Sequence, residues 1–198
     1  MKLPGDKEIR ALHEKYAPSR EAFELVYTHC EIVCGIAEQL LVRSAPDLNA
    51  ELVRAGSLLH DIGVYLLYDD AGILDHSNYL RHGLLGDELL AAEGLPEVIC
   101  RFASHHTGVG LSRDDVRNQH LPLPVADYLA ESGEEQLVMY ADKFHSKTKP
   151  PVFVSAASYA SSLRRFGEAK REFFESLRER FGEPDLAPFI ASYGYALQ

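Results

Sequence analysis

The stretch SLLHDIGVY, residues 57–65, places two ionisable side chains at the end of an apolar run. A buried charge is stable only with a hydrogen-bonding, ionic or metal partner, so His60 and Asp61 each need one. An ion-binding site would supply this partner, and so would a capped, hydrogen-bonded pair in the core. Which interpretation holds depends on the residues that the fold brings to this pair.

Outside this stretch, apolar residues recur every three to four positions along most of the chain, and strand-like alternation is almost absent. This spacing is typical of amphipathic helices, so the predicted fold class is all-α, a single-domain helical bundle. Residues that cap or break helices predict the boundaries. Four helices are expected over residues 19–44, from Asp47 to Gly63, from Ser77 to Gly94, and from Pro96 to HHTGVG at 105–110. Two more follow the capping boxes SRDD (112–115) and SGEE (132–135), and a last one covers 155–181.

The segment between His106 and Ser132 is rich in glycine, proline and turn residues. A connection of this length is often a functional lid or a binding loop, but a plain surface excursion has the same composition. The sequence leaves both interpretations open.

Composition limits the class of protein. At 198 residues with 46% hydrophobic residues, the chain has enough apolar material for one domain. The net charge of −10 argues against a nucleic-acid polymer as partner, because phosphate backbones are bound by clustered Lys and Arg. The apolar runs are shorter than a membrane span and the first residues lack the apolar centre of a signal peptide, so we expect a soluble, cytoplasmic protein without a membrane partner.

The three cysteines, Cys30, Cys34 and Cys100, are expected to be reduced core residues.

Several more histidines and one aspartate lie within or at the ends of the expected helices: His29, His82, His105, His106 and Asp142. Each has a structural explanation on its own, since a histidine on an apolar stripe is often a hydrogen-bonded core residue and an aspartate often caps a helix or pairs with Lys or Arg. One or two divalent ions would satisfy all of them together. Imidazole with carboxylate suits Mn, Fe, Co, Ni or Zn better than Ca, so a transition metal is the expected cofactor.

The ordered set resembles a known family. LLHDIG, preceded by His29 and followed by His82, SHHTG and YADKF, is similar to the HD-domain superfamily of metal-dependent phosphohydrolases, over residues 29–142. RHGLLGDELL, around His82, resembles a segment of the subgroup with two metals, which includes bacterial dinucleoside tetraphosphate hydrolases. The resemblance implies a first ion bound by His29, His60, Asp61 and Asp142, and a second ion held by His82 and His106 and bridged by Asp61. His106 is preferred to His105 because a threonine follows it, although spacing leaves both open.

The resemblance also implies a function, the hydrolysis of a small phosphoester or phosphoanhydride, with a nucleotide as the leading substrate. A metal-bound hydroxide would attack, and Asp61 would be the catalytic residue. Many family members carry a lysine where Val64 stands, so the cation beside the phosphate has to come from elsewhere or be absent, and the candidates are Arg81, Lys143, Lys147 and Lys149. The GYP motif of cyclic-di-GMP phosphodiesterases is missing, which argues against that substrate.

Two other functions stay open at this point. Some HD-domain proteins are di-iron oxygenases, and the chain could also be a metal-stabilised sensor or interaction module without turnover. The metal-binding core is expected over residues 19–148, and the added helix at 155–181 offers a surface for a second copy, which would make a homo-oligomer.

Polar and aromatic residues near the expected site complete the predictions. His76 and His145 are expected near the pocket, and His13 and His120 at the surface. Tyr65, Tyr68 and Tyr79 either line the pocket or belong to the core.

Overall fold

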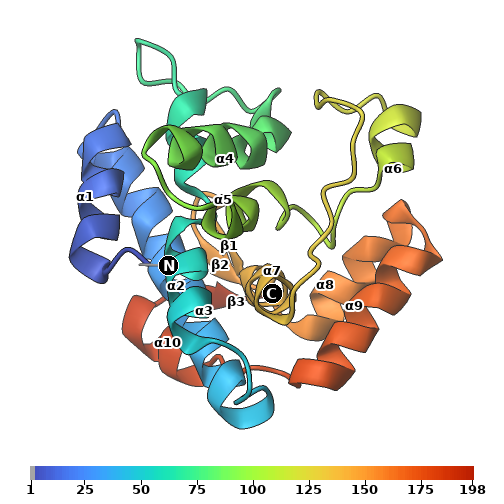
Figure 1. Ribbon diagram of the computed structural model, residues 1–198. Coiled ribbons are helices and arrows are strands. Elements are labelled where there is room, and N and C mark those ends of the chain that lie inside the picture. Colours follow the sequence, from blue (N-terminus) through green and yellow to red (C-terminus); the bar gives the residue numbers. More distant parts are fainter. Residues whose placement is uncertain (1–2) are drawn as a thin grey trace.

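The computed structural model describes residues 3–198 and confirms a helical bundle with one very small sheet (Figure 1). The α-helices are α1 (Asp6–Tyr16), α2 (Arg20–Ser44), α3 (Ala50–Leu59), α4 (His82–Ala92), α5 (Glu97–Ser104), α6 (Arg113–Asn118), α7 (Gly133–Asp142), α8 (Ala156–Leu163), α9 (Glu168–Phe181) and α10 (Ala187–Tyr193). Three short 3-10 helices are η1 (Ile62–Leu67), η2 (Tyr79–Arg81) and η3 (Arg164–Phe166).

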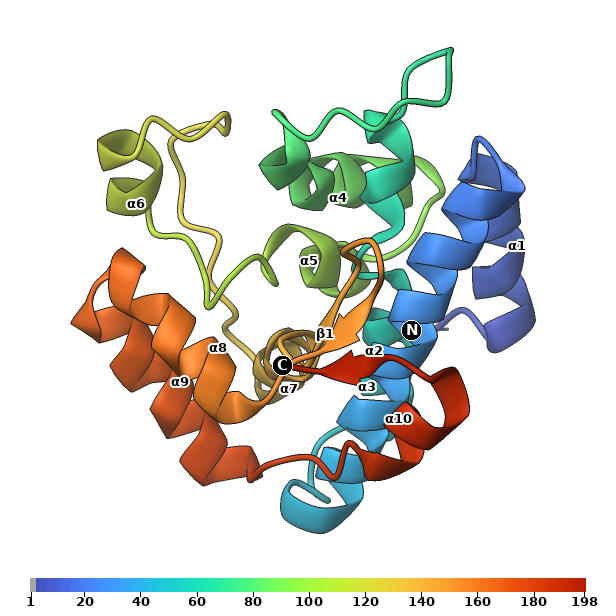
Figure 2. The ribbon, with the colours of Figure 1, turned by 180° about the vertical axis from the view of Figure 1, so that it is seen from behind.

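The sheet joins the middle of the chain to its C-terminal end. Strand β1 (His145–Ser146) pairs antiparallel with β2 (Val152–Phe153), and β2 pairs parallel with β3 (Ala196–Leu197). Figure 2 shows the C-terminal segment with α10 and β3 in red beside the orange β1 hairpin. The last residues therefore lie against the segment that directly follows α7.

Helix α2 is the axis of the fold. It begins after Ser19, whose side chain accepts a hydrogen bond from the Ala22 amide at 3.1 Å, as the sequence predicts for an N-cap. Its second half packs into a core with α7, α8 and α9, and its first half into a core with α1, α3, η1, α4 and α5. His29 lies where these two cores meet.

The length and apolar character of α2 bear on the expectation that the chain has no membrane span. With 25 residues and a mean hydropathy of 1.3 over its best window, α2 is long and apolar enough to cross a membrane, although 61% of that window is buried inside the structure. The central helix of a soluble bundle has the same properties, so this feature is weak support for a membrane span.

The turn after α3 sets the position of the HD pair. Helix α3 begins at Ala50 rather than Asp47 because Asn49 accepts the Leu52 amide at 3.1 Å. It ends at Leu59, earlier than predicted, because His60 Nδ1 bonds the Ser57 carbonyl at 2.7 Å and the backbone then tightens into η1. The pair therefore lies at a helix end, where two adjacent side chains can face one centre.

Two glycines allow η1 and α4 to touch through their backbones. A Cβ atom on Gly63 would lie 2.1 Å from the His82 carbonyl oxygen and 2.3 Å from the Gly86 nitrogen. A Cβ atom on Gly86 would lie 2.9 Å from the Ala103 side chain of α5. Only glycine fits such close approaches, so these residues bring the segments that carry Asp61, His82 and the end of α5 together.

The C-terminal part differs most from the prediction. Residues 155–181 do not form one helix, because Gly167 adopts a φ of +102° and separates α8 and η3 from α9. The helix predicted from Ser77 starts instead as η2 and continues as α4 from His82. Helix α10 and the sheet were not predicted, since their elements are two to seven residues long.

Candidate metal centre

Four side chains meet at the junction of the two cores. His29 Nε2 lies 3.0 Å from Asp142 Oδ1, 3.2 Å from Asp61 Oδ2 and 3.2 Å from His60 Nε2. His60 Nε2 lies 3.5 Å from Asp142 Oδ1. Helices α2 and α7 and the turn after α3 thus bring these donors together, and His29, His60 and Asp142 form a group that could hold a metal ion.

A second group faces the other oxygen of Asp61. His82 Nε2 and His106 Nε2 lie 3.3 and 3.5 Å from Asp61 Oδ1, and 3.0 Å from each other. His82 begins α4 and His106 follows α5. The Asp61 carboxylate therefore stands between the two groups, with one oxygen directed at each.

Backbone hydrogen bonds fix the orientation of three of these histidines. The Nδ1 atoms of His60, His82 and His106 lie 2.7, 2.6 and 2.7 Å from the carbonyl oxygens of Ser57, Tyr79 and Ala103. A carbonyl only accepts, so each Nδ1 carries the proton and each Nε2 presents a lone pair to the centre.

A cation fits this arrangement better than direct contact between the histidines does. Two nitrogen lone pairs 3.0 Å apart, as in His82 and His106, repel each other unless a positive charge lies between them. Asp61 Oδ1 is buried and has no hydrogen-bond partner in the described part of the chain. Donors bound at about 2.1 Å around one ion lie roughly 3.0–3.4 Å apart, which is close to the separations observed here.

Two lysines balance the two carboxylates. The Lys147 ammonium contacts Asp61 Oδ2, and Lys143 donates to Asp142 Oδ2 and to the His106 carbonyl. Burial alone would raise the pKa of both carboxyl groups, but Lys147 holds the pKa of Asp61 well below its usual value and Lys143 does the same for Asp142. Burial lowers the pKa of His82 to about 4, so its ring is neutral at pH 7, and burial also lowers the pKa of His106.

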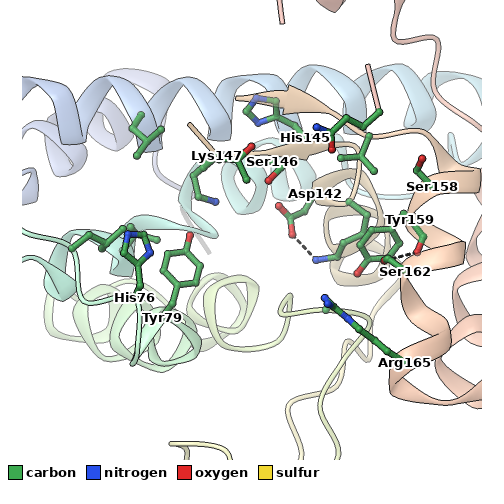
Figure 3. Close-up of a pocket in the computed structure, with 18 residues that line it drawn as sticks. His76, Tyr79, Asp142, His145, Ser146, Lys147, Ser158, Tyr159, Ser162 and Arg165 are labelled. Atoms are coloured by element: carbon green, nitrogen blue, oxygen red, sulfur yellow. Dashed lines mark hydrogen bonds and ion pairs between the residues drawn. The ribbon is translucent and has the colours of Figure 1, made fainter. Parts of the chain in front are cut away.

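A cavity of about 730 Å³ opens beside the first group and includes Asp142 in its lining. Figure 3 shows Lys147 and Tyr79 on one side of this cavity and Tyr159 and Arg165 on the other, with Asp142 between them. Burial raises the pKa of Tyr159, and the nearby charges of Lys143 and Arg165 partly offset that rise. The cavity therefore presents positive charge and aromatic surface next to the histidine and aspartate cluster.

The structure also places the remaining residues singled out in the sequence. His105 is half-buried outside the cluster, with Nδ1 2.7 Å from Ser104 Oγ. Arg81, at the end of η2, is exposed and does not line the cavity. Val64, His76 and Tyr79 line the cavity, whereas Tyr65 is packed in the core. Tyr68 packs against that core from its edge.

His13 corrects the prediction of a surface residue. It is fully buried, with Nδ1 2.9 Å from the Tyr65 hydroxyl and Nε2 2.8 Å from the Leu58 carbonyl. It thus links α1 to the end of α3 and to η1 within the core. His120, by contrast, is exposed as expected.

Two residues that line the cavity were missed or underestimated from the sequence. His145 does more than line the cavity, because its Nδ1 lies 2.7 Å from Nδ1 of His29. Its position three residues after Asp142 was the available signal. Nothing in the sequence pointed to Arg165, because a single helix was predicted over residues 155–181 and the end of α8 at Leu163 was not.

The long segment between His106 and Ser132 contains regular structure. It carries α6, and the Leu111 and Tyr128 backbones bond each other at 3.0 and 2.7 Å. From this segment, Gly108 reaches the cavity lining. The segment is therefore a folded excursion whose base borders the cavity.

Comparisons with known proteins agree with this geometry. The sequence model of the HD domain matches residues 26–147. The HD domain of the phosphodiesterase PgpH from L. monocytogenes aligns with 93% of this chain and 98% of its own, with a TM-score of 0.56 and 18% identity. A second structure of that domain, in complex with cyclic-di-AMP, gives the same TM-score with 17% identity and covers 98% of this chain and all of its own.

Sequence relatives match a shorter part of the chain. A tRNA (cytidine(56)-2'-O)-methyltransferase of Picrophilus torridus is 33% identical over 128 residues, which are 65% of this chain and 33% of the relative. The "Uncharacterized protein MJ0778" of Methanocaldococcus jannaschii is 33% identical over 129 residues, 64% of this chain and 69% of the relative. The chain thus spans about a third of the length of the methyltransferase it matches.

Proposed function

Because the chain belongs to the HD-domain family, we propose that it is a metal-dependent phosphohydrolase that cleaves a small phosphoester or phosphoanhydride, with a nucleotide as its substrate. The observation that carries the proposal is the placement of Asp61. One of its oxygens faces His29 and His60, the other faces His82 and His106, and the cationic cavity adjoins this cluster.

The residues divide into two ligand sets that share one carboxylate. His29, His60 and Asp142 with Asp61 Oδ2 would hold a first transition-metal ion. His82 and His106 with Asp61 Oδ1 would hold a second one. Bound there, such ions supply Lewis-acid stabilisation of phosphoryl oxygens and a bound water of lowered pKa. Asp61 keeps both sets in register, which makes it the residue on which catalysis depends most.

The cavity wall would bind the rest of the substrate. Lys147, whose ammonium contacts Asp61, would supply the positive charge that many family members provide with a lysine at the position of Val64. Lys143 would add a second positive charge at the cluster. Arg165 lies across the cavity and can bind a further anionic group in a bidentate manner. Tyr79 and Tyr159 offer ring surface for a base.

The size of the cavity and one structural neighbour favour a nucleotide. A volume of about 730 Å³ lies within the usual range for small-molecule sites. The PgpH HD domain, which shares the fold, has been solved with cyclic-di-AMP, a nucleotide. The similarity to the tRNA methyltransferases covers too little of their length to carry their activity to this chain.

Metal analysis and a substrate screen test the proposal together. Protein purified without chelator should contain a transition metal, and with Mn, Fe, Co, Ni or Zn it should release phosphate or cleave phosphodiesters in one class of nucleotides. Consumption of oxygen by the iron-loaded protein without phosphate release would instead support a di-iron oxygenase. Bound metal without turnover of any kind would support a metal-stabilised module and contradict the proposal.

A further inference from the structure

One histidine of the cluster is held in a different way from the others. His60, His82 and His106 each donate Nδ1–H to a backbone carbonyl, which no side-chain substitution removes. His29 Nδ1 has a side chain opposite it, the Nδ1 atom of His145 at 2.7 Å. The orientation of His29 therefore depends on the identity of another residue.

The position of one proton follows from this contact. Only one hydrogen fits between two nitrogen atoms 2.7 Å apart, so one ring donates and the other accepts. If His29 is to present its Nε2 lone pair to Asp61 and Asp142, its own proton has to be on Nδ1. His145 must then accept at Nδ1 and carry its proton on Nε2.

The surroundings of His145 hold its ring against His29. It lies on β1, opposite Phe153 on β2, with ring centroids 5.3 Å apart. Tyr195 stacks on it from the C-terminal segment at 5.7 Å and an interplanar angle of 27°. Its Nε2 is buried and has no hydrogen-bond partner among residues 3–198, so no alternative bond rotates the ring away.

We propose that His145 is a positioning residue that fixes His29 as an Nε2 metal ligand by accepting its Nδ1 proton. The inference rests on the metal-binding part of the proposed function and does not depend on which substrate is cleaved. It also gives the C-terminal strand a role, because Tyr195 and the β1–β2–β3 pairing keep the accepting ring in place.

Two substitutions separate hydrogen bonding from packing. His145→Phe keeps an aromatic ring between Phe153 and Tyr195 but removes the acceptor. His145→Asn keeps an acceptor oxygen near the Nδ1 position but loses the ring. We expect His145→Phe to weaken binding of the first ion by about 10- to 100-fold, as losses of such supporting hydrogen bonds do, and His145→Asn to stay within a few-fold of the native chain.

The readouts are metal affinity, from competition with a coloured chelator, and the visible absorption of the Co-loaded protein, which reports the ligand geometry. His13→Phe is the matched control, because it replaces another buried histidine with two hydrogen bonds outside the cluster. It should lower the melting temperature and leave metal affinity unchanged.

Three outcomes would overturn the inference: native affinity in His145→Phe, equal losses in His145→Phe and His145→Asn, or an equal loss in His13→Phe. A native chain that binds no metal would instead contradict the proposed function itself.

Discussion

The floor and the wall of the cavity are built on different principles. We call the cluster beside the cavity, His29, His60, Asp61, His82, His106 and Asp142, the floor, of which only Asp142 lines the cavity, and we call Lys147, Tyr159 and Arg165 the wall. The floor histidines are buried, come from the long helices and their ends, and are mostly oriented by backbone carbonyls. The wall comes from the segment after β1, from α8 and from η3, and its Arg165 is exposed.

This difference separates two tasks. A rigid, backbone-anchored floor suits the chemistry, which needs donors within tenths of an ångström of their positions. A wall of longer, more exposed side chains suits recognition of a substrate. We therefore expect substitutions in the floor to change metal content and rate, and substitutions in the wall to change substrate affinity.

The largest expected effect is at Asp61. Asp61→Asn keeps the shape of the side chain but removes the charge that both ligand groups share. It should lower metal content to below one ion per chain and the rate by on the order of 10³-fold, because such ions stabilise the transition state by several kcal/mol. Metal analysis and steady-state kinetics measure both. Asp114→Asn on exposed α6 is the control, and an active, fully loaded Asp61→Asn protein would refute the shared carboxylate.

His82 tests the division of the floor into two sets. His82→Gln should remove the second ion and spare the first, because His82 Nε2 faces only Asp61 Oδ1 among the carboxylate oxygens of the cluster. Metal-to-protein ratios should fall from two to one. The control is His105→Gln, which lies outside the cluster and should keep both ions. Loss of both ions in His82→Gln would show that the sets are not separate.

Removal of metal should lower stability without unfolding the chain. Ions at about 100 times their Kd add roughly 2.7 kcal/mol, which corresponds to about 5–10 °C in melting temperature for a chain of this size. The fold should persist because Lys147 and Lys143 neutralise the floor carboxylates. Calorimetry with a chelator, then with added Mn or Co, measures the shift. An unchanged melting temperature would argue against ions in the floor.

His13 gives a smaller effect that depends on pH. Burial lowers its pKa from 6.5 to about 4, so the unfolded chain binds more protons than the folded chain between these values. This contribution is present above pH 6.5 and is lost as the pH falls, by about 2 kcal/mol between pH 7 and pH 5. Urea unfolding at both pH values should show a smaller loss in His13→Gln than in the native chain. Identical pH dependence would mean that His13 is not buried as a neutral ring.

Arg165 in the wall gives the smallest effect. Arg165→Ala should raise KM for a nucleotide about tenfold and leave kcat nearly unchanged, because a solvent-exposed charged hydrogen bond contributes on the order of 1.4 kcal/mol. Arg164→Ala is the matched control, since Arg164 is its exposed neighbour and does not line the cavity. Equal KM values for both variants would remove Arg165 from the binding site.

The floor could be predicted from the sequence for a physical reason. A buried ionisable side chain needs a partner, and His29, His60, Asp61, His82 and Asp142 stand at or near apolar helical positions, so their meeting at one place could be predicted. Periodicity cannot choose between neighbours such as His105 and His106, because a small rotation at a helix end decides which one points inward. His13 was misjudged for a similar reason, since its partners Leu58 and Tyr65 are distant in the sequence.

The wall could not be predicted in the same way. The positions of its residues depend on where the predicted helix over residues 155–181 is interrupted. Gly167 was not recognised as the residue that separates α8 and η3 from α9. Arg165 reaches the cavity only because of that break. The contact between His145 and His29 joins residues 116 positions apart, and nothing in local spacing encodes such a pair.

The glycines between η1 and α4 add a final consequence. Because Gly63 and Gly86 let main chain rest on main chain, the distance between η1, which follows Asp61, and α4, which begins at His82, is fixed by backbone contact. A protein that holds two cations of like charge at close range has to resist their mutual repulsion, and a backbone contact yields less than a side chain does. Gly63 and Gly86, which offer no side chain to a metal, would thereby help to set the metal-to-metal spacing.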